Sequence, residues 1–378
     1  MTTSGSSPAV KGVCRAFFAY DVGLSIDLDA AEQLVARTQD GGAQREVIRH
    51  TRRSPPYFQF RPAPLRISRQ GASIAVGAWR TTTTVDFVVY DFGSVCVSYT
   101  IDVDGPLEEL LPLGEALYDN ASLLADSRRR VDELARSLAS SIGRPHTASV
   151  VEDYAVYELG PLGAIDGGAS PDFLERHGHA LARLLRADRQ TLAPQEIQDA
   201  LASRLSYTPT DLAIIDWNAS VLFLQEPEDA RCVLEFANVE LLEMRHLDDQ
   251  LDLALDRSYQ SLTQLEARRG GVLGMVPRSV RAELRRVAEW EMDNSLLFEN
   301  VNNALKLLGD QYLARMYRLA ADKLHLPDWD GSILRKLRVL ESIYAKLNDL
   351  HSARRMELLE WIVIILIAME IVLTLVRH

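Results

Sequence analysis

The segment that decides the fold class reads Val85-Asp-Phe-Val-Val-Tyr-Asp-Phe-Gly-Ser-Val-Cys-Val-Ser-Tyr-Thr-Ile101. Its two apolar runs, Val85 to Tyr90 and Val95 to Ile101, have strand length and are rich in β-branched residues. The four residues between them, Asp91 to Ser94, favour a turn. The segment therefore predicts a β-hairpin. Pro106 then opens a long helical pattern that ends before Gly143.

Further strands and a short helix are expected around this hairpin. Val13 to Tyr20, Ser73 to Ala78 and Ser149 to Leu159 have strand length and β-forming composition. Asp27 can cap a helix over residues 28–37. Together these elements predict a first α+β unit over residues 13–160.

The same order of elements recurs later in the chain. Asp211 to Leu224 has two apolar runs around a polar turn, and a long helical pattern follows from Glu226 to Arg268. Pro171 to Ala202 predicts two short helices. We therefore expect a degenerate duplication, with a second α+β unit over residues 161–268 whose long helix covers a sheet.

Strand patterns stop after Gly270, and the pattern becomes helical. A first stalk helix is expected over residues 269–326. Pro327 to Gly331 should interrupt it, and a second stalk helix is expected over residues 327–357. Apolar residues of this second helix recur at alternating four- and three-residue steps, the pattern of a coiled-coil-like helical hairpin. These expected contacts between copies of the chain are Ile333, Leu337, Leu340, Tyr344 and Leu347.

The C-terminal segment 358–376 is the most apolar stretch of the chain. A helix over these residues would be about 28 Å long, close to the hydrocarbon thickness of a bilayer. Its eleven Ile, Val and Leu residues from position 362 onward favour insertion by roughly 3 to 7 kcal/mol, against about 3 kcal/mol for Glu370. The sequence therefore predicts one transmembrane helix. Its expected lipid-span residues are Leu358, Trp361, Ile364, Ile365, Ile367, Glu370, Leu373 and Val376.

Glu370 is an ionisable residue inside this apolar segment. Such a group usually faces protein or water, because lipid does not solvate its charge. Three readings are open: a contact between copies, a carboxylate hydrated near the headgroups, and a path for protons or ions. Residues that would share the contact stripe with Glu370 are Val363, Ile367 and Thr374.

Composition excludes several classes of protein. A net charge of −12 argues against direct binding to nucleic acid, because phosphate recognition needs concentrated Lys and Arg. Cys14, Cys96 and Cys232 are far apart, which fits buried thiols in a reducing compartment better than a disulfide framework or zinc site. Residues 1–12 predict a disordered N-terminus without a secretory signal or organellar presequence.

Candidate sites for chemistry are few. Carboxylates recur one helical turn apart beside His246 and could hold Mg²⁺ or Ca²⁺, although a solvated helix face explains them as well. His177 and His179, near Glu175, would point to different helix faces, which disfavours a metal site. Basic clusters could contact lipid or RNA, or form ion pairs on helices. The acidic group is Asp248, Asp249, Asp252 and Asp256, and the basic groups are Arg128 to Arg130 and Arg285 to Arg286.

Motifs of nucleophilic and nucleotide-dependent enzymes are missing. The sequence has no Gly-x-Ser-x-Gly elbow, no phosphate-binding loop and no His-Glu-x-x-His motif, and its clustered glycines match no dinucleotide fingerprint. We therefore expect no catalytic residues and no cofactor.

The C-terminal half resembles the Rmd or RMND family, named for proteins required for meiotic nuclear division. The resemblance lies in Leu307-Leu-Gly-Asp-Gln-Tyr-Leu-Ala-Arg-Met-Tyr317, in Ile333 to Leu347, and in Leu359 to Ile367 with Glu370. Asp21 to Asp29 and the Phe87 to Val97 hairpin are similar more loosely. The resemblance implies a self-associating membrane protein without an established enzymatic activity. For mitochondrial members it implies support of translation at the inner membrane, but this chain lacks their presequence and resembles a bacterial member.

The sequence thus predicts an α+β head, a helical-hairpin stalk and one C-terminal transmembrane helix. The expected function is a non-enzymatic, oligomeric scaffold or adaptor at the bacterial cytoplasmic membrane, with its head in the cytoplasm. Its expected partners are other copies of the chain, membrane lipid and an unknown protein. One alternative is a soluble homo-oligomer whose C-terminal helices form a central bundle. Another is a metal-dependent enzyme that uses the Asp248 to Asp256 face.

Overall fold

The computed structural model describes residues 7–37, 42–45, 62–165, 170–267, 311–343, 345–346, 360, 363–364 and 366–367. The chain divides into two compact units, one of Met1–His246 with Leu297–Trp329 and one of Leu247–Leu296 with Asp330–His378. In the part of the chain that the structure describes, no helix combines the length and the apolar character that a membrane crossing requires.

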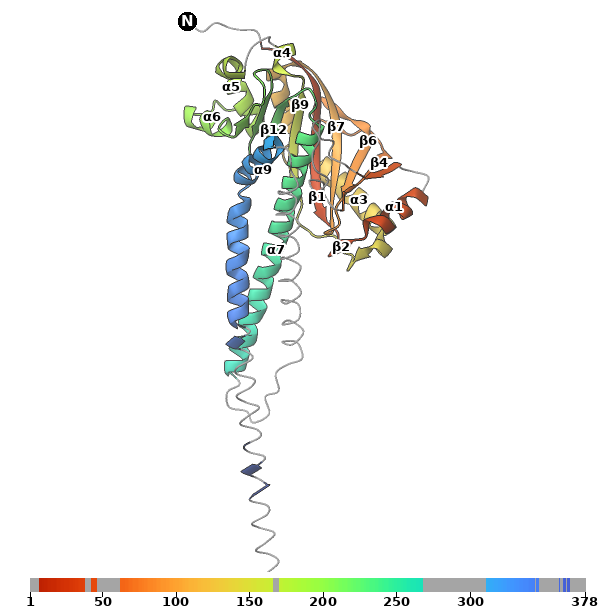
Figure 1. Ribbon diagram of the computed structural model, residues 1–378, viewed down its shortest axis with the longest axis vertical. Coiled ribbons are helices and arrows are strands. Elements are labelled where there is room, and N and C mark those ends of the chain that lie inside the picture. Colours follow the sequence, from red (N-terminus) through yellow and green to blue (C-terminus); the bar gives the residue numbers. More distant parts are fainter. Residues whose placement is uncertain are drawn as a thin grey trace, which may run out of the picture. The chain divides into compact units, whose positions relative to one another are not determined.

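The first unit is built on one ten-stranded sheet, counted over the described residues (Figure 1). The strand order is β10-β11-β12-β9-β1-β7-β6-β4-β3, with β5 paired to β6, and β2 and β8 form a separate pair. The strands are β1 (Ala9–Asp21), β2 (Ser25–Ile26), β3 (Gly42–Arg45), β4 (Leu65–Gln70), β5 (Ala75–Val76), β6 (Trp79–Val89), β7 (Ser94–Pro106), β8 (Ile142–Gly143), β9 (Glu152–Leu159), β10 (Arg204–Leu205), β11 (Leu212–Ile215) and β12 (Ala219–Phe223).

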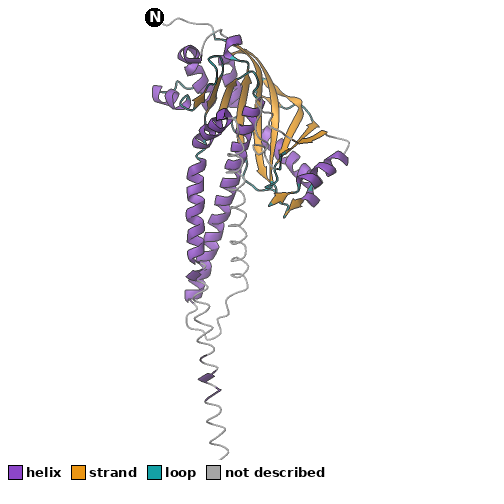
Figure 2. Ribbon diagram, viewed as in Figure 1, coloured by secondary structure: helices purple, strands orange, loops and turns teal. Residues whose placement is uncertain are grey.

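Helices precede, join and follow these strands (Figure 2). Most of them lie against the sheet of the first unit, and α7 runs from the first unit into the second. The α-helices are α1 (Leu28–Arg37), α2 (Leu111–Leu117), α3 (Ala121–Ser137), α4 (Leu162–Ile165), α5 (Ser170–Arg186), α6 (Pro194–Ala200), α7 (Glu228–Ala267) and α9 (Gln311–Lys323), and two 3-10 helices are η2 (Leu107–Leu110) and η3 (Ala139–Ser141).

The two predicted α+β units meet in one sheet at the pairing of β9 with β12, beside the central strand β1. Strand β1 pairs antiparallel with β7 over its whole length, from Ala9 opposite Pro106 to Asp21 opposite Ser94. On its other side it pairs antiparallel with β9, and β9 pairs in parallel with β12. Strands from residues 13–160 and 161–268 therefore share one sheet. This pairing joins distant segments, which local sequence patterns do not reveal.

The two faces of the sheet have different chemistry. Alternate residues of β1 point to opposite faces. Tyr20 belongs to the main apolar core and contacts Ser127 of α3, with 2.7 Å between their hydroxyl oxygens. Arg15, on the other face, lies 3.1 Å from Glu158, which Arg231 of α7 also contacts. One face thus packs apolar side chains against α3, and the other packs many charged groups against α7.

Local predictions were confirmed for several elements. The hairpin is formed by β6 and β7, and α1 covers residues 28–37 as expected. Oδ1 of Asp27 accepts hydrogen bonds from the backbone N–H groups of Asp29 and Ala30 at the start of α1. The two helices expected between residues 171 and 202 are α5 and α6, although α5 starts at Ser170 and, with 17 residues, is not short. The long helix after β12 is α7.

The helical stretch expected between Pro106 and Gly143 is confirmed, but it is interrupted between α2 and α3. The chain ends α2 at Leu117, and Asp119 takes a positive φ of 51°. Asn120 then caps α3, because its side chain accepts a hydrogen bond from the backbone N–H of Leu123 at 2.9 Å. A side chain that caps a helix competes with continuation of the preceding one.

The break after α9 lies earlier than the sequence predicted. Residues 324–325 form the turn, where His325 has a φ of 55°, and residues 326–343 are helical. Pro327 and the residues after it therefore begin the next helix instead of interrupting one. Proline is compatible with the first turn because the N–H groups there have no intrahelical partner.

The strands near β6 also differ from expectation. Ser73 to Ala78 contributes only the two-residue β5, whereas β4 was not predicted. In β4, Leu65 and Ile67 alternate with Arg66, and this short pattern is weak evidence on its own.

Candidate functional site

The predicted stalk contacts that the structure describes are buried within one chain. Ile333, Leu337 and Leu340 are all buried in the second unit. Beside them, Nζ of Lys336 lies 2.7 Å from Asp248 and 2.6 Å from Asp252 of α7. These residues were assigned to contacts between copies, but packing inside the chain already accounts for their burial. Tyr344 and Leu347 lie outside the described residues.

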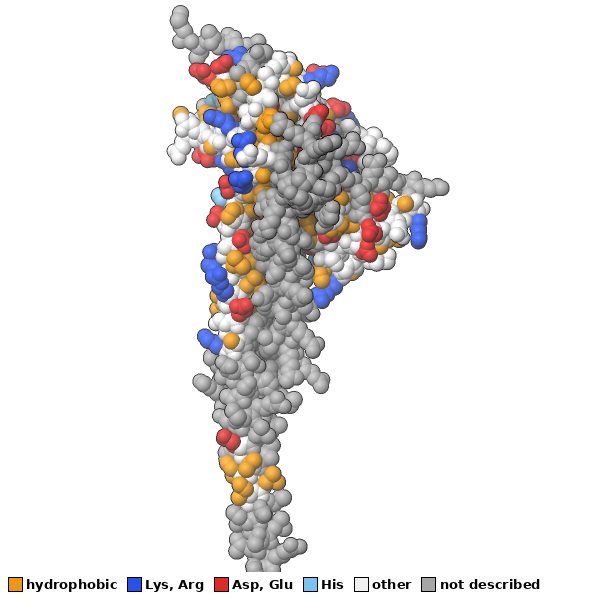
Figure 3. Space-filling view, in the orientation of Figure 1, with side chains coloured by type: hydrophobic (Ala, Val, Ile, Leu, Met, Phe, Trp, Pro, Cys, Tyr) orange, Lys and Arg blue, Asp and Glu red, His pale blue; other side chains and the backbone are white. Residues whose placement is uncertain are grey.

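The predicted membrane segment is described at four apolar positions. Val363, Ile364, Leu366 and Ile367 are helical, and each is between 52% and 55% exposed. Figure 3 shows hydrophobic side chains together in this part of the chain. The remaining predicted positions lie outside the described residues: Leu358, Trp361, Ile365, Glu370, Leu373, Thr374 and Val376.

The acidic face of α7 is partly neutralised. Asp248 and Asp252 share Lys336, whereas Asp249 and Asp256 are exposed. The ammonium group of Lys336 lies between the carboxylates of Asp248 and Asp252. The geometry therefore favours ion pairing over a metal site on this face.

The basic cluster Arg128 to Arg130 makes contacts within the chain, whereas Arg285 and Arg286 lie outside the described residues. Arg129 and Arg130 both pair with Asp126, and Arg129 also pairs with Glu133. The guanidinium of Arg128 stacks 4.9 Å from the Tyr20 ring centroid. The prediction of ion pairing was thus confirmed for two of the three arginines.

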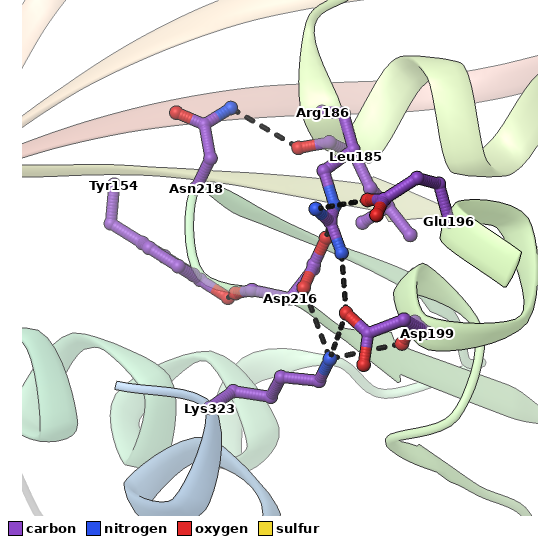
Figure 4. Close-up of polar contacts among 8 residues, drawn as sticks. All are labelled: Tyr154, Leu185, Arg186, Glu196, Asp199, Asp216, Asn218 and Lys323. Carbon is purple, nitrogen blue, oxygen red and sulfur yellow. Dashed lines mark hydrogen bonds and ion pairs between the residues drawn. The ribbon is translucent and has the colours of Figure 1, made fainter. Parts of the chain in front are cut away.

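A network of charged groups surrounds Asp216 in the turn between β11 and β12 (Figure 4). Arg186 of α5 contacts the carboxylates of Asp216, Asp199 and Glu196. Lys323 of α9 contacts Asp199 at 3.2 Å and Asp216 at 3.4 Å. Each cation is shared between carboxylates, so the network fastens α5, α6 and α9 to the sheet and leaves no evident reactive group.

A second group brings together three residues that are far apart in the sequence. Asp21 ends β1, His146 follows β8, and His246 lies in α7. One potential metal-ligand atom from each residue lies within 4.8 Å of those of the other two. The centroids of the two imidazole rings are 5.8 Å apart. This was the one such group of three or more ligand-type residues found within the described residues.

Asp21 and His146 are in direct contact. Nε2 of His146 lies 2.9 Å from Oδ1 of Asp21, and this carboxylate raises the pKa of His146 above its usual value. Asp21 is 5% exposed. No described group donates a well-aligned hydrogen bond to its Oδ1. Nδ1 of His146 faces the backbone carbonyl of Arg144 at 3.2 Å, which orients the ring.

The backbone around this group is held at several points. The backbone N–H groups of His146 and Ala148 donate to the carbonyls of Val22 and Asp21, both at 3.0 Å. The guanidinium of Arg128 donates to the carbonyls of Ala148 and Ser149. These backbone contacts therefore hold the end of β1 and the loop of His146 in place independently of the contact between the Asp21 and His146 side chains.

Glu243 adds a second buried carboxylate. It lies one helical turn before His246, and Ser94 donates a hydrogen bond to its Oε1. Ser94 is the cross-strand partner of Asp21. Burial first, and then the charge of Asp21, raise the pKa of Glu243 well above its usual value. This shift favours the neutral, protonated form of Glu243, so the region combines Asp21, a neutral carboxyl group and two imidazoles.

The sequence patterns did not reveal the group of Asp21, His146 and His246, because at least about a hundred residues separate each member from the next. Only the spacing Glu243-x-x-His246 was visible, since residues three apart share a helix face. The sequence placed His246 beside the acidic face instead of toward β1.

Comparisons with known proteins place the chain in a family. The model of the family described as "Uncharacterized protein MJ0711, N-terminal domain" matches residues 11–229, more than half of the chain. The chain belongs to this family. The match covers the sheet and the helices up to the first residues of α7.

The chain is also similar over most of its length to a curated protein, "Uncharacterized protein MJ0711" of Methanocaldococcus jannaschii. The two are 24% identical over 316 residues, which are 82% of this chain and 84% of the relative. No solved structure matches the chain significantly. None of these findings links it to the Rmd or RMND family.

Proposed function

We propose that the protein is a non-catalytic scaffold or adaptor whose apolar C-terminal helix attaches it to membrane lipid. The observation that carries this proposal is the exposure of Val363, Ile364, Leu366 and Ile367 in one helical segment. Adjacent exposed apolar side chains mark a surface that another phase or protein covers.

Lipid is the proposed occupant because of the sequence around these residues. Residues 358–376 have the length of a bilayer crossing, and the apolar residues outweigh the cost of Glu370. The catalytic motifs sought in the sequence are absent, and the Asp216 network is fully engaged in ion pairs. A protein that binds and positions other molecules therefore accounts for these features better than an enzyme that uses covalent catalysis.

A flotation experiment tests this proposal. The purified full-length protein is mixed with vesicles of phosphatidylcholine and phosphatidylglycerol and separated on a density gradient. We expect the wild type to float with the vesicles and the double variant I364N/I367N to remain at the bottom. The matched control is L253N, which removes an exposed apolar side chain from α7 and should float like the wild type.

The alternative of a bundle between copies makes a different prediction for the same variants. Light scattering without detergent would then show an oligomer for the wild type and a smaller species for I364N/I367N, with no flotation of either. That outcome would show that the apolar segment packs against a second copy of the chain and not against lipid.

A further inference from the structure

We propose that Asp21, His146 and His246 form a binding site for one divalent transition-metal ion, such as Zn²⁺. This inference does not depend on the proposed scaffold function. It rests on the convergence of one carboxylate and two imidazoles from three separate segments of the first unit.

The ligand types fit this class of ion. Imidazole nitrogen together with carboxylate oxygen suits Zn²⁺, Fe²⁺ and related ions, whereas Mg²⁺ and Ca²⁺ prefer sets of oxygen ligands. Three protein ligands leave at least one position for water or another ligand. Such a site resembles open metal centres more than the closed four-ligand sites of structural zinc.

The distances between the three ligand atoms suit a bound metal ion after a small adjustment. Ligands about 2.0 to 2.2 Å from an ion can be little more than 4 Å apart. The three ligand atoms lie within 4.8 Å of one another, so a slight closure brings them into range. The His146 side chain is 47% exposed and has room to turn, whereas the Asp21 side chain is buried.

The surroundings favour a cation over an internal ion pair. Oδ1 of Asp21 has Nε2 of His146 beside it but no well-aligned hydrogen bond from any described group. The Arg144 carbonyl can accept a hydrogen bond from a protonated Nδ1 of His146, which leaves Nε2 free to bind the metal.

The ion would also join three segments of the first unit. Asp21 lies on β1, His146 on the loop that follows β8, and His246 on α7. Metal binding should therefore raise the melting temperature of the wild type, because the ion binds the folded arrangement and not separated segments.

The test uses purified full-length protein stripped of metal with a chelator. Calorimetric titration with Zn²⁺ should show one ion per chain, and Co²⁺ should give visible absorption from nitrogen and oxygen coordination. We expect D21N, H146Q and H246Q each to weaken Zn²⁺ binding at least about 100-fold, the upper end of the loss caused by removing a ligand's hydrogen-bond partner.

Matched controls separate this site from other carboxylates and histidines. D249N changes an exposed residue of the α7 acidic face, and H179Q changes an exposed histidine of α5. Both should bind Zn²⁺ like the wild type and show the same metal-dependent rise in melting temperature. H146Q should lose this rise, and circular dichroism verifies that this loop variant is folded.

Two results would overturn the proposal. One is a wild type that binds no stoichiometric Zn²⁺ or Co²⁺ after chelator treatment. The other is full binding by H146Q together with loss of binding by D249N, which would move the ion to the acidic face of α7.

Discussion

Nε of Arg186 lies 2.5 Å from Oδ2 of Asp216, a residue with no exposed surface. The arginine is at the end of α5, and the aspartate is in the turn between β11 and β12. Lys323 reaches the same carboxylate from α9. These contacts tie helices from distant parts of the sequence to one edge of the sheet.

Replacing Arg186 by methionine should lower the free energy of unfolding by about 3 kcal/mol, because a buried carboxylate loses its nearest cation. Urea denaturation measures this change. The control R189M removes an exposed arginine that pairs with Glu115 and should cost less than about 1 kcal/mol. Adding D216N to R186M should recover part of the loss, and equal losses in R186M and R189M would contradict a buried network.

Glu152 should make stability depend on pH near neutrality. Burial raises the pKa of this carboxyl from 4.5 to about 7, although Arg245 opposes the shift and Asp153 adds to it. The folded protein thus keeps a proton that the unfolded chain has lost. Its contribution to stability is present below about pH 4.5 and is lost as the pH rises through 7.

The variant E152Q isolates this effect because its amide remains neutral. Relative to E152Q, the wild type should lose about 3 kcal/mol of unfolding free energy between pH 4.5 and pH 7, with little change above pH 8. Chemical denaturation of both proteins at several pH values gives the difference. A wild type that is more stable than E152Q at pH 8 would show that the ion pair with Arg245 dominates.

The cysteines should differ in reactivity. Cys14 and Cys96 are buried, and burial raises the pKa of both thiols, whereas Cys232 is partly exposed. Because the thiolate is the reactive form, we expect native protein to react at Cys232 first and at the other two only after unfolding. Mass spectrometry after treatment with a maleimide measures this. Modification of Cys14 at the rate of Cys232 would contradict the burial of β1.

Ile333 should contribute to folding within one chain. The variant I333A removes a fully buried side chain and should destabilise the second unit by roughly 2 to 5 kcal/mol. Its matched control is L334A, which changes the neighbouring, exposed leucine. Denaturation at several protein concentrations tests the assignment, because a contact between copies would make the effect of I333A depend on concentration.

Local structure was predictable where the sequence pattern and the capping residues agree. Asp27 marked the start of α1, and the turn at Asp91 to Ser94 marked the hairpin. The break at Asn120 was missed because the apolar period continues across it, even though Asn is a favoured cap. Pro327 was read as a helix breaker because the sequence alone does not show that it occupies a first turn.

Long-range pairing was not predictable from the same patterns. Nothing in β9 or β12 specifies that the two strands pair in parallel, and this contact turns two expected units into one sheet. The group of Asp21, His146 and His246 was missed for the same reason, since only the fold brings the three residues together. The burial of Ile333 also depends on its neighbours, because a heptad seam looks alike within a chain and between chains.

The central position of β1 has a consequence for synthesis of the protein on the ribosome. The first long strand to emerge needs partners on both sides, and the second of these ends only at Leu159. A nascent chain that stops before β9 exposes to other chains the edge of β1 that β9 would cover from Gly12 to Ala19. Truncated products of this gene should therefore aggregate, and folding of the sheet should follow completion of translation through β12.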